Sequence, residues 1–263
     1  MFWIYDIPTW QLGVSIVTLF VAVSIGGLYL SRGYIKNHFG LSDLSNRGGV
    51  NGYNANVGGL FRLLLGLVAV ATWQDYNSAS TLVSREASAI SVFYQDISSY
   101  PEPYKTELQN RLKTYVHFVV DSEWPAQSKG QRVHGGRQIL LGLQNTLLEL
   151  RPDTARDKVA QSQGFAAYNR LVEARRMRLD SVDSGLPAVL WIVVFSGAIL
   201  SMFVTYFYHF SHFRTHVVLT AVMAVFSGLV VFLTAAVDNP FRGEVSVSSA
   251  PYQLLLETWE VYR

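Results

Sequence analysis

The sequence predicts an all-α membrane protein with four transmembrane helices and a helical soluble region between the second and the third. Three observations support this class. Half of the 263 residues are hydrophobic. Only 15% are charged, whereas soluble globular proteins carry about 25%. Of the 40 charged residues, 27 lie between Asp75 and Asp183, so the rest of the chain is left with long apolar runs.

Three apolar runs contain no charged residue: Leu12–Leu30, Leu186–Tyr208 and Val217–Val237. About 20 apolar residues cross a bilayer core of roughly 30 Å, so each run is long enough to span it. A shorter run, Val57–Trp73, contains Arg62 and is predicted to be the second of the four spans. The glycine-rich stretch 48–59 before it matches no nucleotide-binding loop, and we interpret it as a tight re-entry into the bilayer.

The region between the second and third spans is predicted to form four amphipathic helices. Their expected bounds are Asp75–Ile97, Tyr104–Trp124, Gln138–Leu150 and Thr154 to about Val182. Pro125 is expected to end the second of them. The fourth leads almost directly into the third span, and we expect one continuous or slightly kinked helix there. The chain thus divides into residues 1–73 with two spans, 74–185 as the soluble region, 186–237 with two spans, and a tail at 238–263.

Several function classes are excluded by composition and motifs. The chain has no cysteine, and it has no serine elbow, zinc motif or phosphate loop. We therefore expect no enzyme, no cofactor and no metal site. The net charge of +2 is too small to indicate binding of nucleic acid. The basic residues near the membrane, six on one side against four on the other, favour a cytoplasmic location of the soluble region and of both termini.

Arg62 is the one strong base in a predicted span. On a helix it shares a face with Gly59, Gly66, Ala69 and Trp73. In one interpretation this face lines a pore or vestibule and attracts anions. In a second, the side chain extends along the helix to the membrane surface. In a third, it pairs with Asp238.

Three histidines, His209, His212 and His216, would share one face of a continuous helix. A metal or proton sensor is one interpretation of this spacing. The other is that these are interfacial imidazoles next to Tyr206 and Phe213, and the lack of a nearby acidic residue favours it.

Several landmarks resemble those of the bestrophin-like family of bacterial and plant membrane proteins. They follow one another over roughly residues 50 to 251: Val83-Ser84-Arg85-Glu86-Ala87, Tyr115, Glu123-Trp124-Pro125, Arg175-Arg176-Met177-Arg178-Leu179, Pro187 with Trp191, and Asp238-Asn239-Pro240-Phe241-Arg242-Gly243. The resemblance implies structural roles for Glu86, Glu123, Trp124, Pro125, Asp238, Pro240, Phe241 and Gly243.

The same resemblance implies a function. Bestrophins are pentameric anion channels, so a homo-oligomer in the lipid bilayer is expected, with chloride-like ions passing along the second span. A pore would have to form between subunits, because four helices with one charge hold no polar path of their own. The alternative function is a membrane-anchored sensory or scaffold protein whose helical bundle binds a ligand or a partner protein.

Overall fold

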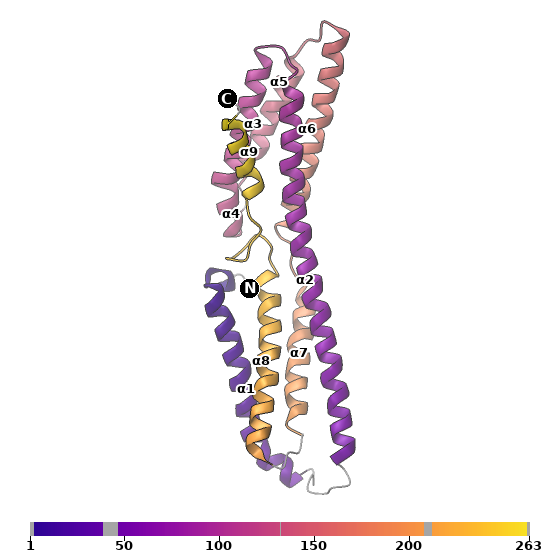
Figure 1. Ribbon diagram of the computed structural model, residues 1–263, viewed down its shortest axis with the longest axis vertical. Helices are drawn as coiled ribbons and strands as arrows, with labels where there is room; N and C mark the ends of the chain where they lie inside the picture. Colours follow the sequence, from indigo (N-terminus) through magenta and orange to yellow (C-terminus); the bar gives the residue numbers. More distant parts are fainter. Residues whose placement is uncertain (1–2, 39–46, 132, 208–211, 262–263) are drawn as a thin grey trace. The chain divides into compact units, whose positions relative to one another are not determined.

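The computed structural model describes residues 3–38, 47–131, 133–207 and 212–261, and every regular element in these ranges is helical (Figure 1). The chain divides into two compact units. We call residues 1–75, 185–238 and 243–245 the span unit, and residues 76–184, 239–242 and 246–263 the bundle unit.

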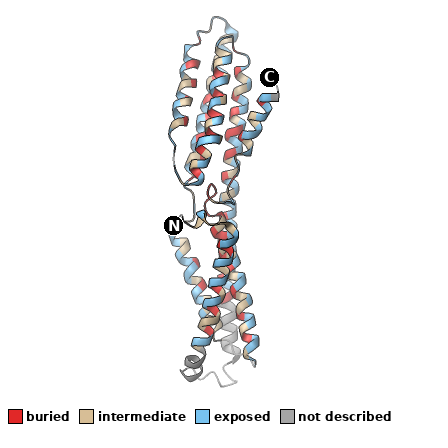
Figure 2. Cartoon of the chain, turned by 90° about the vertical axis from the view of Figure 1, so that its left-hand side faces the viewer, coloured by how far each residue is buried: buried red, intermediate tan, exposed pale blue. Residues whose placement is uncertain are grey.

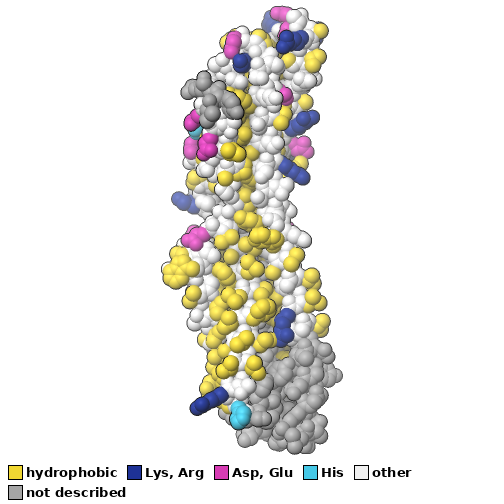
Figure 3. Space-filling view, in the orientation of Figure 1, with side chains coloured by type: hydrophobic (Ala, Val, Ile, Leu, Met, Phe, Trp, Pro, Cys, Tyr) yellow, Lys and Arg dark blue, Asp and Glu magenta, His cyan; other side chains and the backbone are white. Residues whose placement is uncertain are grey.

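The span unit contains three helices that are long and apolar enough to cross a membrane. They are α1 (Thr9–His38, apolar to Ser31), α7 (Ala188–Thr205) and α8 (Phe213–Val237). About half of their large apolar side chains are exposed (Figure 2), as expected of helices with one face toward lipid. On the face drawn in Figure 3, hydrophobic side chains cover the span unit, whereas most charged side chains belong to the bundle unit.

The predicted count of four spans is wrong by length and composition, because three helices of the described chain are long and apolar enough to cross a membrane by themselves. The segment predicted as the second span lies within α2 (Arg47–Ile97). Its apolar run includes Arg62 and continues at once into the polar pair Gln74-Asp75. This part of α2 still packs in the span unit, where Phe61, Leu65 and Val68 are buried against α7 and α8.

Two further expectations about continuity are wrong. The glycine-rich stretch 48–59 belongs to α2 and is helical rather than a loop. The bundle helix α6 (Ala155–Ser181) ends before α7 begins at Ala188, so those two helices are not continuous. The helix that contributes residues to both units is instead α2, with 51 residues.

The bundle unit consists of the second half of α2 with α3 (Tyr104–Phe118), η3 (Val119–Glu123), α4 (Trp124–Ser128), α5 (Gly135–Glu149), α6 and α9 (Ala250–Val261). Pro125 does not end a helix as predicted, because it stands in the first turn of α4. A proline ring would clash with the carbonyl of Asp121, four residues earlier. The π-helical turn η3 covers that residue, and its wider turn, with i→i+5 hydrogen bonds, accommodates the proline.

The core of the bundle unit is formed by the apolar stripes of its helices. Its largest buried members include Phe93, Leu112, Leu143 and Leu171, all fully buried. The C-terminal helix α9, which was expected only as part of a tail, adds further side chains to this core. Its Tyr252 is fully buried, and Trp259 stacks on Tyr94 at 4.3 Å between ring centroids.

Candidate functional site

The bundle core contains charged side chains at positions where apolar residues would be expected. Glu86 stands between Val83 and Ile90 on the buried stripe of α2. Glu123 follows Val119 on the stripe of α3 and η3. Arg175 and Arg178 follow Leu171 on the stripe of α6. This interruption of three stripes is the sequence signal for a buried polar network.

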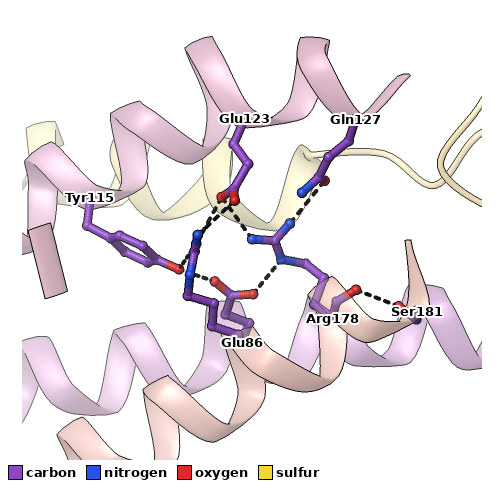
Figure 4. A network of polar contacts seen from close by, with 7 residues as sticks. Glu86, Tyr115, Glu123, Gln127, Arg178 and Ser181 are labelled. Atoms are coloured by element: carbon purple, nitrogen blue, oxygen red, sulfur yellow. Dashed lines mark hydrogen bonds and ion pairs between the residues drawn. The ribbon is translucent and has the colours of Figure 1, made fainter. Parts of the chain in front are cut away.

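These charges meet in one hydrogen-bonded network (Figure 4). Arg178 lies at its centre and donates from Nε to Glu86 at 2.5 Å, from Nη2 to Glu123 at 3.1 Å and from Nη1 to Gln127 at 3.0 Å. Arg175 holds Glu123 with two parallel bonds of 2.8 and 2.9 Å. Tyr115 donates to Glu86 and accepts from Arg175 at 2.8 Å.

The network is balanced in charge, with two guanidinium groups facing two carboxylates. Burial alone would lower the pKa of Arg178, but the charges of Glu86 and other neighbours more than offset this effect. The pKa of Arg178 therefore lies well above its ordinary value. The guanidinium also lies over the rings of Trp124, at 5.6 Å, and Tyr252, at 6.0 Å. Every charge has a partner, so we interpret the network as an internal brace that joins α2, η3, α4 and α6 rather than as an open binding site.

The buried phenols of this network predict a loss of stability at alkaline pH. Burial, followed by the charge of Glu86, raises the pKa of both Tyr115 and Tyr252 well above the usual range. The folded protein therefore keeps both phenols protonated at a pH where the unfolded chain ionises them, above about 10. The resulting stabilisation is complete below about pH 10 and is lost as pH rises through the raised values. Thermal unfolding followed by circular dichroism should show a midpoint that falls over this range.

Substituting Tyr252 with phenylalanine provides the control for this prediction. Tyr252→Phe removes one of the two phenols, so its midpoint should fall less steeply with pH than that of the wild type. A folded wild-type protein in which all tyrosines ionise near pH 10 would contradict the prediction, and the ultraviolet absorbance of tyrosinate measures this directly.

The other motif residues follow the end of α8 or lie close to the network. Trp124 packs edge-on against Phe241, with 5.7 Å between ring centroids. The carbonyl of Pro240 accepts a hydrogen bond from the amide of Val247 at 2.7 Å. Gly243 has a positive φ of 78°, a conformation that favours glycine at this turn. These contacts hold the segment after α8 in a defined turn.

Asp238, the C-cap of α8, accepts hydrogen bonds from two residues of the span unit. Its carboxylate accepts hydrogen bonds from the amide of Leu186, just before α7, at 2.6 Å and from the hydroxyl of Tyr5 at 3.5 Å. Burial raises the pKa of this carboxyl group. Among the described residues no ion pair joins Asp238 to Arg62, so the third interpretation of Arg62 finds no support.

The predicted face of α2 lies on the surface of the span unit. Gly59, Arg62, Gly66 and Trp73 are exposed and Ala69 is half-buried, so the five residues share one side of the helix. The guanidinium of Arg62 lies beside Gly58, one turn earlier, where the methyl group of an alanine would stand 3.2 Å from Nη2. A positive charge is thus presented on a surface that is otherwise apolar.

The three histidines do not lie on one continuous helix. His212 has an extended backbone and precedes α8, while His216 is buried within α8 with Nε2 at 3.0 Å from the carbonyl oxygen of Thr205. His209 lies outside the described residues. Sequence reasoning named the residues of the brace only as motif members. It did not identify Gln127 or Tyr252, because neither is a charged residue on an apolar stripe.

Comparison with known proteins places the chain among membrane proteins of one family. A family model for the bestrophin-like domain matches residues 18–252. One similar crystal structure is described as that of a membrane protein, with 12% identity, a TM-score of 0.66, and coverage of 94% of this chain and 96% of that chain. Another is a mutant of a bacterial bestrophin homologue from Klebsiella pneumoniae, with 12% identity, a TM-score of 0.68 and the same coverage. No curated protein is similar enough in sequence to match.

Proposed function

We propose, on the premise that this chain belongs to the bestrophin-like family, that it is the subunit of an oligomeric ion channel selective for anions. The pore lies between subunits and is lined by the exposed face of α2 in the span unit. By analogy with the family, the proposed channel is a pentamer and its permeant ion is chloride-like. The bundle unit and both termini lie in the cytoplasm of a bacterium, with the span unit in its inner membrane.

The observation that carries this proposal is the exposed charge of Arg62 on α2. A charged side chain at membrane depth is unfavourable and normally faces protein or a water-filled cavity. Within the described residues Arg62 forms no ion pair. A mobile anion in a pore between subunits would neutralise its charge.

The chemistry of the guanidinium group favours anions over cations. Arginine remains protonated at all physiological pH values, so a symmetric ring of such groups cannot relieve its repulsion by losing protons. Anions that enter the ring gain Coulomb energy, and this gain increases as water is excluded. Cations are repelled by the same field.

Among the residues that the structure describes, no observation favours the alternative function, a bundle that binds a ligand or partner. The interior of the bundle unit is filled by apolar side chains and by a network whose charges are all paired. A ligand would have to displace these groups.

A measurement of mass tests the first requirement of the channel. The subunit has a mass of 29.4 kDa, and the solubilised protein should have a mass several times larger after correction for bound detergent. The same sample, reconstituted in a planar bilayer, should carry current. A monomer at micromolar concentration would contradict a pore between subunits, and an oligomer without current would contradict conduction.

A further inference from the structure

The depth of Arg62 in the membrane follows from the packing of α2 against α7. The helix α7 has 18 residues and is about 27 Å long, which matches a bilayer core of roughly 30 Å. Its tenth residue, Gly197, therefore stands near the middle of the core. The two ends, Ala188 and Thr205, are about 13 Å and about 12 Å away along the helix.

Phe61 connects that midpoint to α2. A methyl group built on Gly197 would lie 2.5 Å from the ring of Phe61, so the glycine leaves the space that the ring occupies. Phe61 is buried in the same apolar cluster as Val194 and Ala198 of α7. Arg62 is the next residue, so its backbone also stands near the midpoint of α7.

The charged end of Arg62 does not leave this zone. The guanidinium lies beside Gly58, three residues before Phe61 and hence about 4.5 Å further along α2. That displacement is less than half of the roughly 12 Å that separate Gly197 from Thr205 along α7.

The polar end of the apolar run of α2 marks one boundary of the core independently. That run ends at Trp73, and the exposed polar pair Gln74-Asp75 follows at once. A carboxylate such as that of Asp75 is costly inside the hydrocarbon core, so this pair lies at or beyond the level of the lipid headgroups. Trp73 is eleven residues beyond Arg62, which places Arg62 about 16 Å below that level.

We infer that Arg62 holds its charge near the middle of the bilayer, out of reach of the lipid headgroups, and that the face of α2 around it contacts water and small anions. This excludes the interpretation in which the side chain extends to the membrane surface. The inference deepens the proposed function and rests on it for the identity of the anions. The depth and the contact with water do not depend on conduction.

The absence of cysteine from the sequence allows a direct test in liposomes. Gly66→Cys places a thiol on the Arg62 face and leaves Arg62 intact, and a methyl group at that position has no atom within 4 Å. Ile199→Cys is the matched control, because Ile199 is 66% exposed on α7 two residues from Gly197. A charged methanethiosulfonate reagent reacts with the thiolate, which forms in water and not in hydrocarbon.

We expect the mass of the Gly66→Cys protein to show nearly complete labelling, and that of Ile199→Cys to show none. A spin label on Ile199→Cys should report the depth of the bilayer centre, and one on Val189→Cys the depth of the headgroups. Protection of Gly66→Cys to the same extent as Ile199→Cys would overturn the inference, as would a headgroup depth at residue 199. If the labelling is as expected but the wild type carries no current, the proposed function fails while this inference stands.

Discussion

Arg178→Met should destabilise the bundle unit by about 3–5 kcal/mol, the range measured when one partner of a buried ion pair is removed. Arg178 is fully buried and donates to two carboxylates and one amide. Methionine has a similar length and no charge, so the substitution leaves little cavity. It leaves Glu86 without its guanidinium partner and Glu123 with only Arg175. Unfolding by heat or denaturant, followed by circular dichroism, measures the loss.

Two further variants make this result specific. Arg176→Met on the same helix changes an 81% exposed side chain that stands 3.9 Å from Asp180, and it should shift stability by about 1 kcal/mol or less. The double variant Arg178→Met with Glu86→Gln removes the unpaired charge and should recover part of the loss. Equal effects of Arg178→Met and Arg176→Met would contradict the role of the network as a brace.

Most helices of this fold could be predicted because their signals are local, whereas α9 was expected only as part of the C-terminal tail. Uncharged runs of the right length mark α1, α7 and α8, and apolar stripes mark the helices of the bundle unit. The errors lie where local patterns compete with packing. Gly48 to Gly59 resembles a loop by composition, but these residues continue the helix of α2. Pro125 resembles a helix end, but the π-turn before it absorbs the ring.

The network could be predicted only in part, for a physical reason. A charge on an apolar stripe such as Glu86 indicates burial and hence a partner. The partner, Arg178, is 92 residues away in the sequence. Which guanidinium meets which carboxylate depends on the order of helices around the core, and no local pattern encodes that order. The α2 face remains a prediction, since exposure in one subunit does not reveal what covers it.

Arg62→Glu should move the reversal potential of the reconstituted channel away from the anion limit. In a tenfold salt gradient, a pore permeable to anions alone reverses about 59 mV to one side of zero, and one permeable to cations alone about 59 mV to the other. The wild type should lie on the anion side. Arg62→Glu replaces each positive charge with a negative one at the same depth, so its potential should approach zero or cross it.

Two variants separate the charge of Arg62 from its size and from the net charge of α2. Arg62→Gln removes the charge while keeping a polar side chain, so it should reduce conductance with a smaller shift in reversal potential. Arg85→Glu makes the same charge change on an exposed residue of α2 in the bundle unit, about 140° around the helix axis from Arg62. Arg85→Glu should change the reversal potential only slightly. If Arg62→Glu and Arg85→Glu both leave it at the wild-type value, Arg62 does not face the ion path, because a charge on the pore axis cannot be inverted without changing the relative permeability of anions and cations.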